Sequence, residues 1–355
     1  MGSTMASGWM TRLMSSGTEG TLALGLALGH ELGIFDVIMA SPEPMTSQEI
    51  AEKGKLKERY LREWLGCMVA GEVIQANRGN PERYYIAEDH KGALEGMGIA
   101  GRLFAAYAVR YDAVKACFRQ DGPAGLSHSD YPDVFSVFHV MREASATDTI
   151  DNILNAVPGL AAKLGEGIDV VDFGCGTGVL VLEMAKRFPS SRFHGSDISS
   201  QGISIALKHL AQTQLTNATF SQDDLLSLPE HLHGKYDWAL TYDVIHDLSE
   251  PLKALNEIAL CLKPDGLYVM GDLHTPKDRC GIAGDDSSMG LYGLSMFLCL
   301  PASAGEGGAL GPGAAWSKEE AHALIAQSRL ELVQSASRQP YFAYHICKKR
   351  STAQQ

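Results

Sequence analysis

Residues 170–180 read VVDFGCGTGVL, an apolar run that ends in an acid and is followed by three glycines at alternate positions. The run belongs to a predicted strand at 168–173, and residues 178–188 have the apolar spacing of a helix. A strand, a glycine turn and a helix form the first unit of a doubly wound α/β sheet, whose ligands lie beyond the carboxyl ends of the strands. The three glycines therefore predict a ligand that approaches the backbone closely at the start of the helix.

The rest of the carboxyl-terminal half alternates between the two kinds of element. The sequence predicts further strands at 191–198, 218–222, 236–244 and 266–273. It predicts helices at 201–213 and 250–262, then one more helix and two more strands near the end. Strands that alternate with helices indicate a parallel sheet covered on both faces.

The amino-terminal half has a different pattern. Helices are predicted at 19–40, from 46 and at 57–70, and two short extended pieces follow at 72–76 and 83–87. Three helices and a small hairpin are the order of a winged helix, so we expect a winged-helix domain at 18–90. A mostly helical linker or lid region is expected at 91–165 and the α/β domain at 166–350. The first 15 or so residues are expected to form a loose or lightly docked tail.

Four features of the sequence bear on the ligand of the glycine loop. Val179 stands where the dinucleotide fingerprint GxGxxG has its third glycine, which argues against a nicotinamide or flavin cofactor. Asp172 suits an ammonium group better than a pyrophosphate. Asp197 ends the second strand, about where an acid binds ribose hydroxyls. Asp224 follows the third strand, where it could accept a hydrogen bond from an adenine amino group. An amino acid, a ribose and an adenine together describe S-adenosyl-L-methionine.

With these residues the sequence resembles the class I S-adenosylmethionine-dependent methyltransferases. DFGCGTG at 172–178 stands where that family has its E/DxGxGxG motif. The resemblance implies a Rossmann-like core with a seven-stranded, mostly parallel sheet, and S-adenosyl-L-methionine as the cofactor. The cofactor-binding residues that we predict are Asp172, Gly174, Cys175, Gly176, Gly178, Asp197, Ile198, Asp224, Leu225 and Asp243.

Nearly the whole chain beyond residue 18 resembles a mycobacterial-type group of winged-helix methyltransferases, which are related to small-molecule O-methyltransferases. The resemblance implies a small-molecule methyl acceptor. Whether oxygen, nitrogen or carbon receives the methyl group stays open. In the O-methyltransferases the winged-helix module serves dimerisation. Small residues at helical spacing in 19–40 also suggest a homodimer through the N-terminal domain.

The candidate catalytic residue is His246, in TYDVIHDLSE at 241–250. In the plant O-methyltransferases a motif HDW supplies the catalytic histidine at this place, and here it reads His-Asp-Leu. A neutral imidazole with an ordinary pKa suits a general base. A histidine that only caps or packs is the alternative.

The amino-acid composition also limits which other partners the protein is expected to bind. The net charge of −12 argues against binding to nucleic acid or anionic membranes. No apolar stretch is long enough to cross a membrane, and seven scattered cysteines suggest a reducing compartment, so we expect a cytoplasmic protein. His231 and His233 lack a partner at metal-ligand spacing, so no metal is expected. Two rival hypotheses remain: a cofactor-binding regulator that reads DNA through the basic stretch 53–64, and a pseudoenzyme that binds the cofactor without transferring a methyl group.

Overall fold

The structure is a computed structural model that describes residues 2–97, 100–126, 131, 134–305, 311–339 and 341–350. The chain divides into two compact units. The first comprises Met1–Val109 and Ser136–Met141, and the second Arg110–Phe135 and Arg142–Gln355. The limits expected from the sequence, at 18–90, 91–165 and 166–350, stay a prediction.

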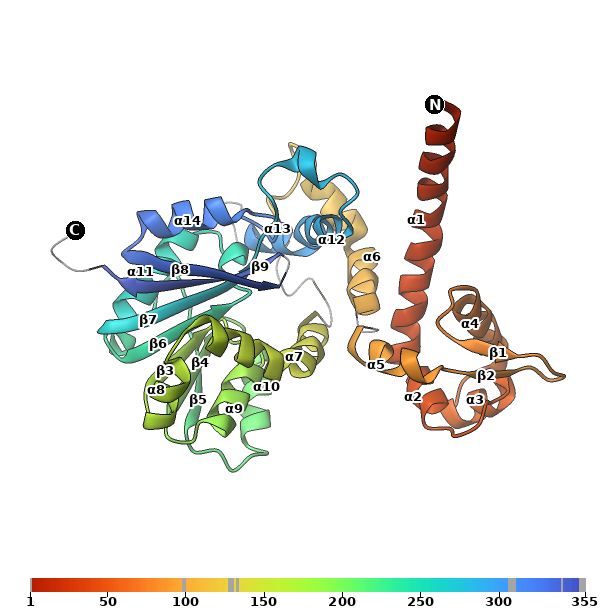
Figure 1. Cartoon of the computed structure of the whole chain (residues 1–355), viewed down its shortest axis with the longest axis horizontal. Helices are drawn as coiled ribbons and strands as arrows, with labels where there is room; N and C mark the ends of the chain where they lie inside the picture. Colours follow the sequence, from red (N-terminus) through yellow and green to blue (C-terminus); the bar gives the residue numbers. More distant parts are fainter. Residues whose placement is uncertain are drawn as a thin grey trace. The chain divides into compact units, whose positions relative to one another are not determined.

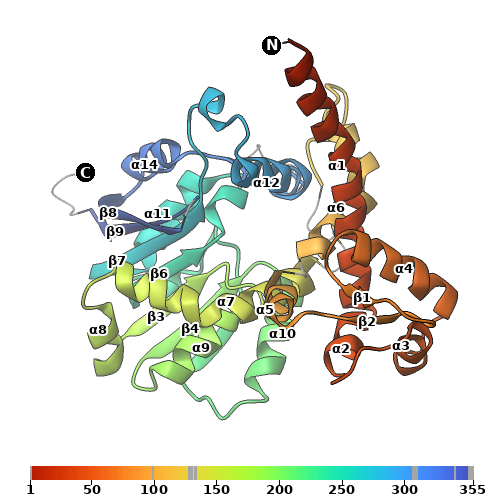
Figure 2. The same cartoon turned by 45° about the vertical axis from the view of Figure 1, so that its right-hand side comes forward.

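In the first unit, helices come before and after a small hairpin, and α1 is the longest of them (Figure 2). Its elements are α1 (Gly2–Glu31), α2 (Ile34–Met39), α3 (Ser47–Gly54), α4 (Glu58–Ala70), β1 (Gln75–Asn77), β2 (Arg83–Tyr85), α5 (Glu88–Met97) and the first part of α6 (Ala100–Cys117). The strands β1 and β2 pair antiparallel. This order of helices followed by a hairpin is the one expected for the winged helix.

Close packing in this unit depends on two glycines of α1. The Trp64 Nε1–H donates to the carbonyl of Gly25 at 2.8 Å, which joins α4 to α1. A Cβ atom on Gly29 would lie only 2.3 Å from the ring of Phe35. Glycine at these positions thus lets α1 approach its neighbours within one chain. The small-residue spacing that suggested a homodimer is therefore used for packing inside the protomer.

The first residues, expected to form a loose or lightly docked tail, belong to α1, which is helical from Gly2 onward and exposed at residues 8–14. The expected helix at 19–40 is also interrupted, at Gly33 with a φ of 65°, where α2 begins. Hydroxyl groups in the early part of α1, such as those of Ser15 and Thr18, donate to carbonyls one turn back. Trp9, Met10, Leu13 and Met14 have helical spacing, but the many glycine, serine and threonine residues around them have low helix propensity and so argued against a helix.

The second unit is built on a seven-stranded sheet with the order β5-β4-β3-β6-β7-β9-β8 (Figure 1). Its strands are β3 (Asp169–Phe173), β4 (Arg192–Asp197), β5 (Ala218–Gln222), β6 (Tyr236–Tyr242), β7 (Leu262–Leu273), β8 (Leu330–Gln339) and β9 (Phe342–Lys349). β9 runs in the direction opposite to that of the other six strands of this sheet. The expected α/β fold with a seven-stranded, mostly parallel sheet is confirmed.

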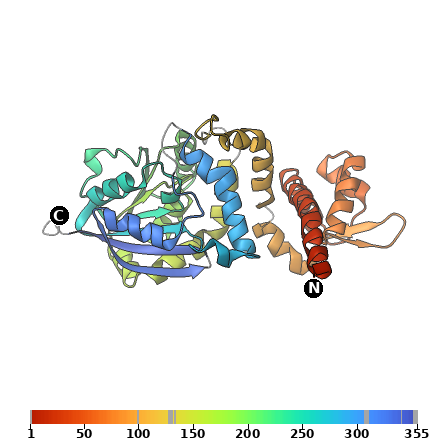
Figure 3. The ribbon, with the colours of Figure 1, turned by 90° about the horizontal axis from the view of Figure 1, so that it is seen from above.

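Helices cover both faces of this sheet because its central strands are apolar on both faces. Val170 and Leu240 belong to a core cluster with residues of α7, α8 and α9, whereas Val171 and Ala239 belong to a cluster with residues of α11 and α14. Figure 3 shows α14 lying along β8. The helices are α7 (Val134–Ala156), α8 (Leu160–Glu166), α9 (Val179–Arg187), α10 (Ser200–Leu210), α11 (Pro251–Cys261) and α14 (Lys318–Gln327).

The carboxyl ends of β3 to β7 meet at one edge of the sheet, which we call the carboxyl edge. A capping segment of α12 (Asp286–Leu294), a π-helical turn (Ser295–Cys299) and α13 (Leu300–Ser303) follows β7 in the chain. None of the helices in the described ranges has the length and apolar character needed to span a membrane.

Candidate functional site

The loop between β3 and α9 adopts a conformation that needs its glycines. Gly174, Gly176 and Gly178 have φ values of 74°, 55° and 77°, in the left-handed region. A Cβ atom on Gly178 would lie 2.6 Å from the ring of Phe220, so this glycine also serves packing. A Cβ atom on Gly176 would meet nothing within 4 Å. The middle glycine therefore faces open space in which a ligand can approach the backbone.

Asp197 is held at the end of β4 by two backbone amides. Its Oδ2 accepts from the Gly176 N–H at 2.7 Å, and its Oδ1 accepts from the Ser199 N–H at 2.8 Å. The carboxylate is thus fixed against the glycine loop. The next residue, Ile198, leaves 62% of its surface exposed, which is unusual for isoleucine and suits the face of a planar ligand.

Asp172 has a buried carboxyl group whose Oδ1 is not satisfied by the described part of the chain. The residue is only 3% exposed, and no hydrogen-bond partner of its Oδ1 lies among the described residues. Burial raises the pKa of Asp172 to about 7, while Arg142 acts to lower it and Asp197 to raise it. A ligand ammonium group would supply the missing partner, as the sequence predicts for the methionine part of the cofactor.

Cys175 lies between these acids in the glycine loop. Its backbone N–H donates to the carbonyl of Ser196 at 3.1 Å, which ties the loop to β4. Burial raises the pKa of the Cys175 thiol well above its usual value, and Asp172 and Asp197 raise it further. The thiol is therefore protonated and serves the loop as a small side chain.

The turn after β5 separates two neighbouring acids. Asp223 accepts hydrogen bonds from the hydroxyls of Ser196 and Ser221, so its carboxylate is used within the protein. Asp224 is exposed, and its Oδ1 accepts from the Leu226 N–H at 2.8 Å. Leu225 is 9% exposed and packs in the core. Of the two acids, Asp224 is the one accessible to a ligand.

Sequence reasoning missed Arg142, which lies on α7. Its Nη2 is 3.8 Å from Oδ2 of Asp243, and its guanidinium is 4.1 Å from the ring centroid of Tyr242. It is also the cation that acts on the pKa of Asp172. Arg142 lies far upstream of the glycine motif, and no local pattern of its helix marks it. Only the fold brings it to the carboxyl edge.

Asp243 has a strained backbone directly after β6. Its φ of 65° is rare for a residue with a side chain, and its N–H donates to the carbonyl of Gly271 at 2.8 Å. No hydrogen bond to its Oδ1 is made by the described residues. Strain of this kind, beside an unsatisfied carboxylate oxygen, is typical of ligand-binding positions.

His246 is buried between two carboxylates. It is 1% exposed; its Nδ1 lies 2.5 Å from Oδ1 of Asp272, and its Nε2 lies 3.1 Å from Oδ1 of Asp247. Burial alone lowers the pKa of His246, but Asp247 and Asp272 outweigh it and raise the pKa well above its usual value. The structure thus differs from the neutral imidazole that the sequence suggested. In this arrangement neither ring nitrogen is open to a substrate proton.

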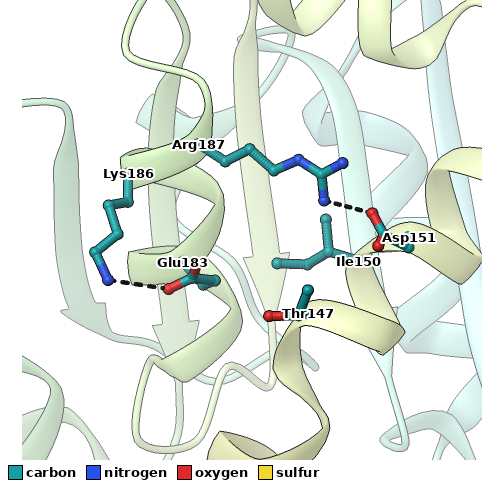
Figure 4. Close-up of a pocket in the computed structure, with 6 residues that line it drawn as sticks. All are labelled: Thr147, Ile150, Asp151, Glu183, Lys186 and Arg187. Atoms are coloured by element: carbon teal, nitrogen blue, oxygen red, sulfur yellow. Dashed lines mark hydrogen bonds and ion pairs between the residues drawn. The ribbon is translucent and has the colours of Figure 1, made fainter.

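A surface cavity of about 410 Å³ lies elsewhere in this unit, between α7 and the last turns of α9 (Figure 4). Arg187 pairs with Asp151 there, and Lys186 pairs with Glu183 (Figure 4). These four charges are used in ion pairs, and the glycine loop adjoins the opposite end of α9. The cavity is therefore no rival to the carboxyl edge as the functional site.

Two family models match the chain. A methyltransferase domain matches residues 164–297, and an Rv2258c-like winged HTH domain matches residues 20–95. The chain therefore contains a winged-helix domain followed by a methyltransferase domain. The resemblance noted from the sequence is confirmed.

Curated relatives match over part of the chain. A demethylmenaquinone methyltransferase of Chlamydia pneumoniae is 32% identical over 32% of this chain and 48% of its own length. A malonyl-[acyl-carrier protein] O-methyltransferase of Halalkalibacterium halodurans is 33% identical over 28% of this chain and 37% of its own length. The chain thus spans less than half the length of these relatives.

Solved structures match over nearly the whole chain. Human N-acetylserotonin methyltransferase in complex with SAM has a TM-score of 0.72 at 18% identity, over 96% of this chain and 98% of that one. The mitomycin 7-O-methyltransferase MmcR has a TM-score of 0.68 at 18% identity, over 98% of this chain and 99% of that one. Likeness at this identity establishes a shared fold.

Proposed function

We propose that the protein is an S-adenosylmethionine-dependent methyltransferase that acts on a small-molecule acceptor, with oxygen as the methylated atom. The observation that carries this proposal is the buried Oδ1 of Asp172, which has no hydrogen-bond partner in the described ranges, together with the open space at Gly176. The family model of the domain and the O-methyltransferases that share the fold support the same activity.

The residues at the carboxyl edge fit this cofactor. Asp172 would bind the ammonium group of its methionine part, and Arg142 would bind the carboxylate of the same part. Asp197 would accept hydrogen bonds from the ribose hydroxyls, with Ile198 against the adenine. When bound, S-adenosylmethionine supplies a methyl group on a sulfonium, which is already a good leaving group. The protein's part is to align the acceptor and exclude water.

The remaining cofactor contacts are inferred from where the residues lie at the carboxyl edge. Asp224, exposed after β5, would accept from the adenine amino group, with Leu225 beside it. Asp243 would meet either the cofactor or the acceptor through Oδ1, which accepts no hydrogen bond from the part of the chain that the structure describes. The Gly174, Gly176 and Gly178 backbone, with Cys175 between, would line the methionine part.

A catalytic role for His246 stays a prediction. For this histidine to act as a general base, Asp247 would have to release Nε2, and the two carboxylates that favour the protonated ring would have to be offset. A His246→Ala protein that binds the cofactor and turns over a true acceptor at an unchanged rate would remove it from the mechanism.

A DNA-reading role has less support. Arg59 and Arg62 of α4 each form an ion pair on the same helix, with Glu63 and Glu58 respectively. Arginines used in this way offer little to a phosphate backbone. The solved structures that share the fold over nearly the whole chain include enzymes named as methyltransferases, which favours catalysis over a cofactor-binding pseudoenzyme.

Two further proposals concern the oligomeric state of the protein and its location in the cell. We propose a homodimer through the first unit, supported by the exposed apolar side chains Trp9, Met10, Leu13 and Met14 of α1. We also propose a cytoplasmic location, supported by the free state of all seven cysteines.

Calorimetry tests the cofactor proposal. S-Adenosylmethionine and its demethylated product should each give saturable heat with one site per chain, and NAD should give none. Saturation by NAD with no heat from either adenosyl compound would overturn the proposal. Mass spectrometry of small molecules released on denaturation would then identify the class of the acceptor.

A further inference from the structure

A nitrogen, an oxygen and a sulfur atom, contributed by two separate elements, lie close together next to the carboxyl end of β6. They belong to His246, Asp247 and Cys299, and one ligand atom of each lies within 4.8 Å of the other two. His246 and Asp247 lie in the short helical turn Ile245–Asp247, and Cys299 ends the π-helical turn of the capping segment. The spacing of the sequence could not reveal this cluster because Cys299 lies far along the chain.

We propose that His246, Asp247 and Cys299 bind a zinc ion, with His246 as a ligand through Nε2. An imidazole, a carboxylate and a thiolate are the ligands that zinc takes in proteins, whereas magnesium and calcium avoid sulfur. Zinc bonds of about 2.0–2.3 Å at tetrahedral angles put ligand atoms roughly 3.2–3.8 Å apart. The distance of 3.1 Å between Nε2 and the Asp247 Oδ1 is close to this spacing.

Asp272 completes the arrangement from the other side of the ring. It is 1% exposed, and its Oδ1 lies 2.5 Å from the His246 Nδ1. A carboxylate that accepts from Nδ1 fixes the ring and leaves Nε2 to the metal, as metal-binding histidines usually require. The N–H of His246 also points to Oδ2 of the same carboxylate at 3.3 Å.

A second set of three residues is nearby but fits a metal less well. Asp243, His246 and Asp272 also offer atoms within 4.8 Å of one another. In that set the ring nitrogen and the carboxylate are the 2.5 Å pair. This distance is that of a hydrogen bond and is too short for two atoms bound to one ion.

The surroundings favour a cation. Three carboxylates, those of Asp243, Asp247 and Asp272, lie around the one imidazole of His246. The Nη2 atom of Arg142 is 3.8 Å from Oδ2 of Asp243. The backbone is also fixed, because the carbonyl of His246 accepts from the Gly313 N–H at 2.9 Å. The ligands thus need small movements of side chains and little movement of the chain.

Three protein ligands leave a fourth position on a zinc ion, as in catalytic zinc sites. The acceptor's hydroxyl would bind there and lose its proton to water more readily, because a bound zinc lowers the pKa of such a group. Ion binding itself does not depend on the proposed function, but this use of the ion does. It names the class of acceptor: a small molecule that presents a hydroxyl group.

Metal analysis of the full chain tests the proposal. After removal of metals by a chelator, added zinc should bind at about one ion per chain, as measured by competition with a chromophoric chelator. Cobalt in its place should give a thiolate-to-metal absorption in the near ultraviolet. Cys299→Ser should abolish that absorption, and Asp247→Asn should weaken binding more than tenfold. Asp272→Asn should weaken it about 10–100-fold.

Cys280→Ser is the matched control, since Cys280 is a free and exposed cysteine. It should bind zinc and cobalt as the unmodified protein does. Thermal unfolding would confirm that each variant is folded. Absence of metal binding to the unmodified protein, or an absorption that survives Cys299→Ser and is lost in Cys280→Ser, would overturn the proposal. Calorimetry with S-adenosylmethionine on the same metal-free sample distinguishes this outcome from failure of the proposed function.

Discussion

Asp172 links cofactor binding to pH at the scale of a single residue. Its pKa of about 7 means that the carboxyl is largely protonated below pH 7 in the free protein. Only the carboxylate pairs well with an ammonium group, so affinity for S-adenosylmethionine should fall below pH 7 and approach a tenfold loss per pH unit. Calorimetry from pH 5.5 to 8.5 measures this. In Asp172→Asn the affinity should be lower and the slope should vanish; a slope that persists would assign the effect to another group.

The same carboxyl should lower the stability of the free protein at alkaline pH. Its pKa is about 7 in the folded protein, against an ordinary pKa of 3.8 in an unfolded chain. Folding therefore favours the protonated form, so its contribution to stability is present below pH 4 and is lost as pH rises through 7. Asp172→Asn should raise the free energy of unfolding at pH 8 by about 1–4 kcal/mol, less at pH 4. Urea unfolding at both values checks this, and an equal change at both would contradict it.

Asp197 offers a contrast, because its carboxylate is already satisfied by the amides of Gly176 and Ser199. Asp197→Ala should weaken S-adenosylmethionine binding about 10–100-fold, since charged hydrogen bonds to the ribose and the fixed loop are both lost. The same change at Asp265, an exposed acid in β7 near its amino end, is the control and should leave affinity unchanged. Equal losses in the two variants would mean that Asp197 has no specific role.

At the scale of the element, two glycines of the loop between β3 and α9 should differ in their effects on cofactor binding and on stability. Gly176→Ala places a methyl group in open space with a φ of 55°, so it should cost only about 1–2 kcal/mol in stability and still abolish cofactor binding. Gly178→Ala adds an overlap with Phe220 and should cost about 2–5 kcal/mol. Denaturant unfolding and calorimetry on both variants measure the two effects. Normal binding by Gly176→Ala would show that the ligand does not approach there.

Elements whose residues share one local pattern were predictable from the sequence. Runs such as VVDF predicted the core strands, and the distance from Gly178 predicted that Asp197 ends the next strand, as it does in β4. The start of β7 at Leu262 was missed because KPDG at 263–266 has the composition of a turn. Arg142 and Cys299 were missed for another reason. Each reaches the carboxyl edge only through the tertiary fold, and no local spacing encodes that meeting.

At the scale of the whole molecule, the main feature is a group of exposed apolar side chains on α1. Its Trp9 and Met14 are 69% and 72% exposed, and with Met10 and Leu13 they form a group without a charged residue except Arg12. Together with Leu24 and Leu28 farther along the helix they would bury on the order of several hundred Å² per protomer, near the roughly 800 Å² of a stable interface. Such an exposed apolar group on a free helix usually marks an interface.

Replacing Trp9 and Met14 together by serine should therefore convert a dimer into a monomer. The loss of this apolar area removes much of the association free energy while leaving the buried core of the first unit intact. Sedimentation velocity at micromolar concentration measures the change. Tyr60→Ser is the control, because Tyr60 is 76% exposed on α4 and outside the group. A dimer that persists in the double variant would place the interface elsewhere, and a monomeric unmodified protein would exclude the proposed homodimer.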